Sequence, residues 1–273
     1  MKSKFAHKLD LEEKVVNAIK PRTIVKEGAF LIPYISPGMN MLEVGCGSGS
    51  MSQGFAHCLY PGSVTGIDIN AEQITLARTL AQQENMNNLD FHIADVYALP
   101  FDNECFDLVF AHNLFIHLSD PPNALKELHR VCKTGGLVGF RDGLGGFCYY
   151  SDFPLRHKYH DLNQFIGIVG QFSDGNPAIG VQLKGLLQTA GFSDLKMTTF
   201  SEVYDKPADM VMLKSWYQGL MQGWMGELAL LHGLISQQEL NQLIASMDQW
   251  ESDPAALNVI LWIEHIAKKI SLS

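Results

Sequence analysis

Three glycines at alternate positions are the first feature of the sequence that could do chemistry. Gly45, Gly47 and Gly49 stand in the stretch MLEVGCGSGSMS, and glycine lets a ligand approach the bare backbone. A dinucleotide-binding fingerprint would need a glycine at Ser50, and no Lys-Ser/Thr pair follows to complete a P-loop. Glu43, two residues before the first glycine, is expected to support the amides of the loop. The loop by itself therefore argues against two phosphate-binding motifs.

Two acidic residues end the next two predicted strands. Asp68 closes the run VTGID and Asp95 closes LDFHIAD. A carboxylate in the first position can accept from both ribose hydroxyls of an adenosine, and one in the second can accept from an adenine amine. Asp95 could instead cap the following turn. Because ligands of open α/β sheets bind at the carboxyl ends of strands, we expect the glycines and both acids to form one adenosine pocket.

Strands and helices are predicted to alternate along most of the chain. Strands are expected at residues 39–44, 63–69, 89–95, 106–112, 137–142, 193–203 and 256–269. Helices are expected at residues 9–21, 22–35, 71–83, 121–133, 158–170, 178–190 and 208–235. Residues 143–154 are expected to form a loop. Alternation of this kind indicates a parallel sheet with helices on both faces.

Five motifs in order make the sequence resemble the class I S-adenosylmethionine-dependent methyltransferases. They are LEVGCGSGS, VTGIDIN, HIADVYALPF, FDLVFAHNLFIHLSDP and ALKELHRVCKTGGLVGFRD. The chain is most similar to the ubiquinone/menaquinone biosynthesis methyltransferases. The resemblance implies a doubly wound, Rossmann-like α/β fold with a seven-stranded, mostly parallel sheet whose last strand is antiparallel. Beyond residue 142 the match fades.

The resemblance also implies S-adenosyl-L-methionine as cofactor and assigns residues to it. The glycine loop would line the methionine end, the second strand would hold the ribose and adenine, and the third strand would meet the adenine edge. The end of the fourth strand would lie beside the sulfonium. The residues expected at the cofactor are Glu43, Gly45, Gly47, Gly49, Asp68, Ile69, Asp95, Val96, His112 and Asn113. No His/Cys cluster suggests a metal.

The expected chemistry is an in-line displacement at a sulfonium, accelerated mostly by positioning of the nucleophile and the methyl group. The fold does not require a specific base. If one exists, His117 in FIHLSDPP is the first candidate, with Tyr149 and His157 in reserve. His117 could equally hydrogen-bond the helix start near Asp120. The aromatic residues after the fifth strand could simply cover the edge of the sheet.

A helical segment at residues 207–253 is predicted as an insertion between the last two strands. Its apolar residues recur at steps of three and four, so they share one helical face. They are Met210, Leu213, Tyr217, Leu220, Met221, Trp224, Leu228 and Leu231. That face could pack on the sheet, as it does in most amphipathic helices. Its methionines and nearby glycines favour a lid that closes over a largely apolar substrate.

The expected organisation has three parts. Residues 1–36 would form an N-terminal helical arm, and residues 37–206 with 254–273 the S-adenosylmethionine-binding α/β domain. Residues 207–253 would form the helical lid.

Composition and charge narrow the class of protein. Hydrophobic residues make up 47% and charged residues 18%, which is typical of a globular chain. The net charge of −9 repels phosphate backbones, so nucleic acid is not an expected partner. Five cysteines without a CxxC motif favour a reducing compartment. With no secretory signal and no apolar run long enough to span a membrane, we expect a cytoplasmic protein without stable membrane insertion. A homodimer is compatible with the sequence.

Together these features predict methyl transfer from S-adenosyl-L-methionine to a small, largely apolar molecule. One alternative is an enzyme of the same fold that uses the bound sulfonium only for electrostatics, for example in a cyclisation. Another is a non-catalytic cofactor-binding protein. The methylated atom, whether oxygen, nitrogen or carbon, is left open by the sequence, because fold analogy does not choose among chemistries.

Overall fold

A seven-stranded sheet runs through the chain in this computed structural model, which describes residues 22–173 and 175–270. The strands lie in the order β3-β2-β1-β4-β5-β7-β6. Their bounds are β1 (Met41–Val44), β2 (Val64–Asp68), β3 (Leu89–Ile93), β4 (Phe106–His112), β5 (Cys132–Tyr149), β6 (Phe192–Tyr204) and β7 (Leu257–Lys269). All seven overlap the strands predicted from the sequence.

Most of the sheet is parallel, and its last strand in sequence is antiparallel. β1 pairs in parallel with β2 and β4, β2 pairs so with β3, and β4 with β5. The direction of β7 follows from its side-chain bonds to β6. The Ser193 hydroxyl donates to the Lys268 carbonyl at 3.5 Å, and the Thr198 hydroxyl donates to the Glu264 carboxylate at 2.7 Å. Residue numbers therefore rise along β6 in the direction in which they fall along β7, so the two strands are antiparallel. The predicted sheet is confirmed.

The chain divides into two compact units, and the division falls within β5, β6 and β7. The glycine-loop unit comprises residues 22–143, 179–199 and 263–270. The helical unit comprises residues 144–173, 175–178 and 200–262. The predicted insertion at 207–253 lies wholly within the helical unit, together with residues 144–173 that the sequence assigns to the cofactor domain. The role of 207–253 as a lid stays a prediction.

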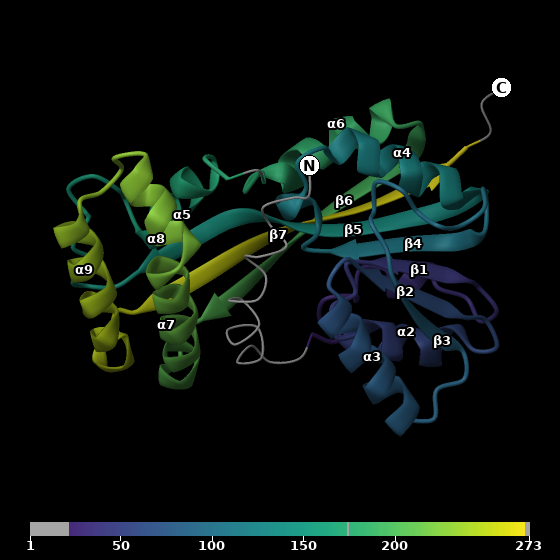
Figure 1. Cartoon of the computed structure of the whole chain (residues 1–273), viewed down its shortest axis with the longest axis horizontal. Coiled ribbons are helices and arrows are strands. Elements are labelled where there is room, and N and C mark those ends of the chain that lie inside the picture. The colour runs from purple at the N-terminus through teal and green to yellow at the C-terminus, as the bar shows by residue number, and fades with distance from the viewer. Residues whose placement is uncertain (1–21, 174, 271–273) are drawn as a thin grey trace. The chain divides into compact units, whose positions relative to one another are not determined.

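Helices cover both faces of the sheet in the glycine-loop unit (Figure 1). α2 (Ser50–Leu59) and α3 (Ala71–Gln83) lie on one side, and α4 (Pro121–Val131) and α6 (Ile179–Thr189) on the other. β4 alternates accordingly: Leu108 and Phe110 pack with α2, whereas Val109 and Ala111 pack with α4 and α6. This strand is buried on both faces, which explains its continuous apolar run.

Local sequence signals fix where these helices begin. The Asn70 side chain accepts from the amides of Glu72 and Gln73 at the start of α3. Asp120 does the same for the Asn123 amide at 3.2 Å, and Pro121 occupies the first turn of α4. Asx residues and an early proline are the preferred helix starts. DPPN is therefore a helix cap here, as the sequence indicates.

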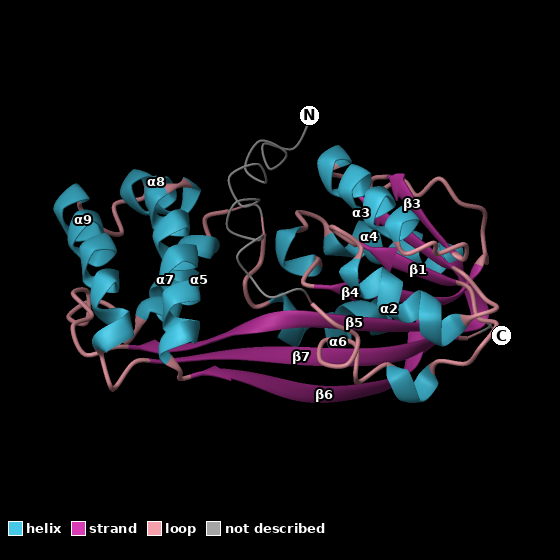
Figure 2. Cartoon of the chain, turned by 90° about the horizontal axis from the view of Figure 1, so that it is seen from below, coloured by secondary structure: helices cyan, strands magenta, loops and turns pink. Residues whose placement is uncertain are grey.

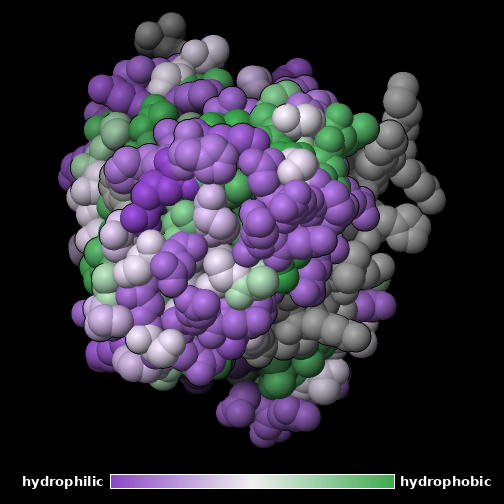
Figure 3. All heavy atoms as spheres, turned by 90° about the vertical axis from the view of Figure 1, so that its left-hand side faces the viewer, coloured by the Kyte–Doolittle hydropathy of each residue, from purple (hydrophilic) through white to green (hydrophobic). Residues whose placement is uncertain are grey.

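The helical unit has an apolar core of its own. It contains α5 (Leu162–Gly170), α7 (Pro207–Gln222), α8 (Trp224–Leu231), α9 (Gln237–Ser246) and the 3-10 helix η3 (Met247–Ser252). Tyr217 and Trp250 are buried in it at a ring separation of 5.4 Å, with Tyr150 5.2 Å from Trp250. The surface seen in Figure 3 is mostly hydrophilic, with small hydrophobic areas between polar ones. Amphipathic helices thus turn their apolar faces inward.

The single helix predicted over 208–235 is wrong, because the chain breaks at Gly223 between α7 and α8. A side chain at Gly226 would stand 2.0 Å from the Met221 carbonyl oxygen, so only glycine permits this close return of the backbone. The stripe from Met210 to Met221 is buried as predicted, whereas Leu231 is 77% exposed. The change of axis at Gly223 takes Leu231 off the shared face.

Two further predictions need correction. Residues 143–149, expected to be part of a loop, continue β5 to Tyr149 (Figure 2). Residues 22–35 form turns and a short 3-10 helix (Ile32–Tyr34) instead of an α-helix. The helix predicted at 9–21 lies outside the described residues. Among the described residues, no helix combines the length and apolarity needed to cross a membrane.

Candidate functional site

The loop after β1 has a backbone that glycine makes accessible. Gly45, Gly47 and Gly49 have φ values of 72°, 53° and 77°, in the left-handed region. A Cβ on Gly49 would lie 2.4 Å from the ring of Phe91, which is 1% exposed and packed in the core. All three glycines are favoured by the left-handed backbone. Gly45 and Gly49 are also required because a Cβ at either position would crowd a neighbouring side chain, whereas a Cβ on Gly47 would meet only a Gln73 side-chain atom at 3.8 Å.

The carboxylate of Asp68 is oriented by two backbone amides. Its Oδ2 accepts from the Gly47 amide at 2.9 Å, and its Oδ1 accepts from the Asn70 amide at 2.9 Å. The first bond joins the end of β2 to the glycine loop, as the sequence predicts for one shared edge. Each carboxylate oxygen has two lone pairs, so each keeps one for another donor.

Glu43 lies in the core and contacts α2. Its side chain is 3% exposed and accepts a short hydrogen bond from the Ser52 hydroxyl of α2. Burial raises the pKa of Glu43 to about 7, although the Ser52 bond and the charge of Arg22 act in the opposite direction. This carboxylate is thus engaged by a side chain of α2, whereas the sequence expects it to support the amides of the glycine loop; that role stays a prediction.

The residues expected around an adenine differ in exposure. Ile69 is 54% exposed at the end of β2, although it is apolar. Asp95 is exposed, and its Oδ1 accepts from the Tyr97 amide at 3.0 Å. It therefore caps the following turn, the alternative left open by the sequence, and its second oxygen stays available. Val96 is 8% exposed and packs in the core.

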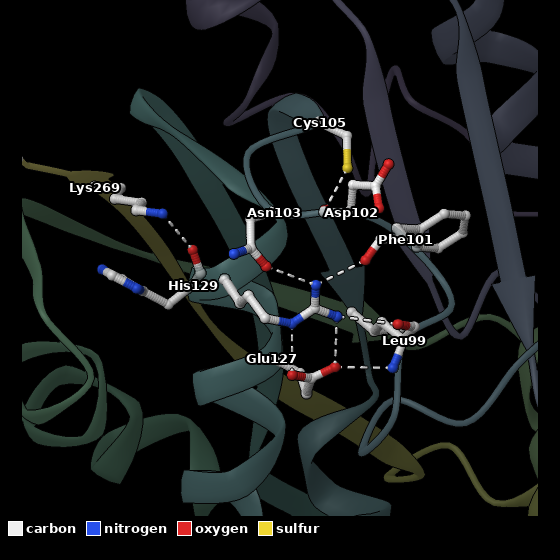
Figure 4. A network of polar contacts seen from close by, with 9 residues as sticks. Leu99, Phe101, Asp102, Asn103, Cys105, Glu127, His129 and Lys269 are labelled. Atoms are coloured by element: carbon white, nitrogen blue, oxygen red, sulfur yellow. Dashed lines mark hydrogen bonds and ion pairs between the residues drawn. The ribbon is translucent and has the colours of Figure 1, made fainter.

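A polar network centred on Arg130 holds the segment after Asp95 (Figure 4). The guanidinium binds Glu127 through two bonds of 2.8 Å and donates to the carbonyls of Phe101 at 2.7 Å and Leu99 at 3.0 Å. Glu127 in turn accepts from the Leu99 amide at 2.9 Å. Bidentate pairing of this kind fixes geometry. α4 thereby anchors the chain that follows the third strand.

His112 and Asn113 end β4 at the same edge of the sheet. His112 is 5% exposed, and burial lowers its pKa well below the ordinary value, so its ring is neutral near pH 7. Asn113 has φ 55°, and its amide donates to the Arg141 carbonyl at 2.8 Å. A non-glycine residue in the left-handed region is uncommon and concentrates at functional sites.

One of the three candidate bases belongs to the glycine-loop unit, and the other two belong to the helical unit. His117 is exposed on the 3-10 helix η2 (Phe115–His117) of the glycine-loop unit. Tyr149 ends β5 in the helical unit, with the Arg156 guanidinium 4.8 Å from its ring centre. His157 lies 3.5 Å from Glu239, which also binds Lys158 at 2.6 Å. His117 therefore shares its unit with the glycine loop, and the other two do not.

Asp142 is a residue at this edge to which the sequence assigned no role. It follows Arg141, which pairs with His112 across β4 and β5, and its side chain is fully buried. Its Oδ1 accepts from the Ile116 amide at 3.1 Å and its Oδ2 from Phe115 at 3.3 Å. Its place as the acid that closes the strand predicted at residues 137–142 was the available signal. Among the described residues, no cluster of three metal-ligating side chains occurs.

Residues 42–140 match the family model described as a methyltransferase domain. An uncharacterized methyltransferase of Schizosaccharomyces pombe is 31% identical over 163 residues, which are 57% of this chain and 57% of that protein. The chain thus matches little more than half the length of this relative. An O-methyltransferase of Pyrenophora dematioidea is 30% identical over 207 residues, which are 73% of this chain and 72% of that protein.

Solved structures agree on the fold. The YcgJ protein of Bacillus subtilis superposes with a TM-score of 0.62 at 16% identity, covering 89% of this chain and 97% of that one. Haemonchus contortus phosphoethanolamine N-methyltransferase 2, in complex with S-adenosyl-L-methionine, gives 0.59 at 17% identity, covering 99% and 59%. The relative from Pyrenophora dematioidea, 30% identical and covered over 72% of its length, shows that the chain belongs to the S-adenosylmethionine-dependent methyltransferase family.

Proposed function

We propose that the chain binds S-adenosyl-L-methionine at the edge formed by the glycine loop, Asp68 and Asp95, and transfers its methyl group to a small, largely apolar molecule. The orientation of Asp68 carries the proposal. With one amide bond on each oxygen, from Gly47 and Asn70, the carboxylate keeps one lone pair per oxygen. Two oxygens fixed in this way suit the neighbouring hydroxyls of a ribose.

Surface exposure supports an adenine at the same edge. Ile69 presents 54% of its surface without an apolar neighbour that covers it, and a flat aromatic ring would remove that area from water. One oxygen of Asp95 is free of the Tyr97 bond and can accept from the adenine amine. The Haemonchus enzyme that shares the fold binds S-adenosyl-L-methionine, which supports the same cofactor here.

The neutral state of His112 suits a positively charged sulfonium. A protonated imidazole beside it would repel the cofactor, and burial opposes that protonation by lowering the pKa of His112. The residues at this edge would act mainly by holding the methyl group in line with the acceptor. His117 is the first candidate for a base, because it shares a unit with Asp68 while Tyr149 and His157 belong to the other.

A hydroxyl oxygen is the acceptor to test first, because one of the relatives is an O-methyltransferase. The protein would be incubated with S-adenosyl-L-methionine and a library of apolar molecules that carry hydroxyl, amine or activated carbon groups. We expect S-adenosylhomocysteine to be released with a hydroxyl compound. A cyclised product without S-adenosylhomocysteine, or binding without any turnover, would contradict methyl transfer.

The cofactor site is tested by replacing Asp68 with alanine and measuring binding by calorimetry. We expect affinity for S-adenosyl-L-methionine to fall by about 1.5–3 kcal/mol, because bonds to a charged group are lost. Asp90→Ala is the matched control, since that exposed acid lies at the opposite end of β3 and pairs with His92. Wild-type affinity in Asp68→Ala would exclude the ribose assignment.

We also propose that residues 207–253 act as a lid over the substrate. Among the described residues, the three apolar clusters of the glycine-loop unit contain none from this segment, so cofactor binding should survive its replacement by a short Gly/Ser turn. Turnover should be lost. Because Tyr150 and Phe165 would lose their cover, hydrogen exchange on the intact chain is the companion measurement. Exchange within 207–253 that stays unchanged when cofactor and substrate bind would argue against a lid.

A further inference from the structure

The turn after β4 is held by one fully buried carboxylate. Asp142, near the middle of β5, accepts from the amides of Phe115 and Ile116 at 3.3 and 3.1 Å. The Asn113 amide, just before the turn, is bound by the Arg141 carbonyl at 2.8 Å. Residues 113–116 are thus attached to two consecutive residues of β5. All of these contacts lie within the glycine-loop unit.

The same turn packs against the glycine loop. The Cδ1 atom of Leu114 lies 3.0 Å from the point where a Cβ on Gly45 would stand. Leu114 lies between Asn113, held by Arg141, and Phe115, held by Asp142. The carboxylate of Asp142 therefore sets how closely the turn approaches the loop after β1. These two segments contain residues expected at the methionine end of the cofactor.

We infer that Asp142 is a positioning residue for the cofactor, because its carboxylate fixes the turn at residues 114–116 against the glycine loop. The inference rests on the proposed function, in that the cofactor is S-adenosyl-L-methionine. Asp142 itself acts through the turn and touches no reacting atom in this scheme.

A carboxylate is a costly group to bury, and this cost makes the inference testable. Burial raises the pKa of Asp142 to about 7, against the opposing effects of its backbone bonds and of the charge of Arg22. An asparagine has nearly the same volume but offers one acceptor oxygen, and its NH₂ group would face an amide N–H. Asp142→Asn therefore removes the buried charge and disturbs the turn in one change.

The first experiment compares Asp142→Asn with Asp107→Asn at pH 8. Asp107 lies on β4, at the end of that strand opposite to His112, where it accepts from the Asn40 amide and from Lys133 of β5. We expect the dissociation constant for S-adenosyl-L-methionine to rise about tenfold in Asp142→Asn, the effect of losing one bond to a charged group, with no loss of thermal stability. Asp107→Asn should lose stability and keep its affinity. A wild-type dissociation constant in Asp142→Asn would overturn the inference.

Two further readouts separate positioning from a general structural role. In the wild type, affinity for the cofactor should decline as pH falls from 8 to 6, because protonation takes one acceptor from the turn. In Asp142→Asn this part of the pH dependence should disappear, while the part due to Glu43, whose pKa is also about 7, should persist. An identical pH profile in both proteins would contradict the inference.

Hydrogen exchange without cofactor keeps the test independent of the proposed function. The amides of residues 114–116 should exchange faster in Asp142→Asn than in Asp107→Asn. If the wild type binds no S-adenosyl-L-methionine, the proposed function fails, and with it the link to the cofactor. Unchanged exchange at 114–116 would instead show that Asp142 does not hold the turn, whatever the ligand.

Discussion

The two units bury polar groups in different ways. In the glycine-loop unit, Glu43 and Asp142 are buried carboxylates that bind Ser52 and the turn after β4. In the helical unit, Tyr217 donates to Asn163 at 2.7 Å and Asn163 donates to Asn258 at 3.0 Å, so this buried network is neutral. The buried Asp161 of that unit caps the start of α5 by accepting from the Gln164 amide at 3.0 Å. A buried charge costs more than a neutral hydrogen-bonded pair. In the glycine-loop unit this cost is paid next to the edge proposed to bind the cofactor, whereas in the helical unit the buried Asp161 serves a helix start.

Backbone conformation follows the same division. Left-handed residues gather at the strand ends of the glycine-loop unit, among them Gly45, Gly47, Gly49 and Asn113. Among the described residues of the helical unit, only Gly233 has a positive φ. Strain of this kind persists where surrounding structure enforces it and concentrates at functional sites. The comparison suggests that one unit is built for precise geometry and the other for apolar packing.

Among the changes that test this comparison, replacing Trp250 with alanine should cause the largest loss of stability. Its side chain is 1% exposed and contacts Tyr150 and Tyr217, so the cavity should cost about 3–5 kcal/mol of stability. Denaturant unfolding would measure the loss, and Leu231→Ala, at a 77% exposed site, is the control. Calorimetry should find cofactor affinity retained. Loss of affinity in a folded Trp250→Ala protein would break the separation between the units.

The contribution of Asp142 and Glu43 to stability should fall as pH rises from about 4 to 7. Burial raises the folded pKa of Asp142 and Glu43 to about 7, above their ordinary values of 3.8 and 4.5. Their protonated forms therefore stabilise the folded state fully at low pH, and this contribution is lost as pH passes 7. The effect is on the order of 3 kcal/mol for each group. Urea unfolding at several pH values, compared between the wild type and Asp142→Asn with Glu43→Gln, would measure it as a difference, because burial lowers the pKa of His112 and His265 and gives both proteins an opposing pH dependence.

Two glycine substitutions should separate strain from crowding. Gly49 and Gly233 both have positive φ, at 77° and 65°, but only Gly49 has a ring within 2.4 Å of the added Cβ. Gly233→Ala should cost ~1 kcal/mol from the left-handed backbone alone. Gly49→Ala should cost ~2–3 kcal/mol, because overpacking adds to that strain. Equal losses in thermal unfolding would indicate that Phe91 moves aside freely.

The smallest effect is expected from Tyr217→Phe. The change leaves the ring in place and removes the donor to Asn163, at a cost of about 1 kcal/mol. Because the network is neutral, the loss should be the same at pH 5 and pH 8. Stability measured at both values tests this, and a loss that depends on pH would show that a titrating group is coupled to the network of Tyr217, Asn163 and Asn258.

Features that depend on local sequence were predictable. The alternating strands, α3 at residues 71–83 and the cap at Asp120 follow from periodicity and capping residues that act over a few positions. Asp68 ends β2 as expected, whereas Asp95 lies beyond the end of β3 at Ile93. The extension of β5 through residues 143–149 was missed, because its glycines indicate a loop locally. The pairing of β4 with β5 ends at Arg141, but β7 lies on the other side of β5 and supplies partners for its backbone.

The sequence by itself determined where strands occur along the chain, the glycine loop and the carboxylate that ends β2, because each is encoded within a short window of residues. Only the tertiary structure decided that Glu43 is engaged by Ser52, that Asp142 holds a turn 26 residues earlier, and that the helix breaks where Gly226 meets Met221. These outcomes depend on which distant groups come together in the core. Burial then changes their chemistry, since the pKa of a carboxyl group depends on the solvent that its neighbours exclude.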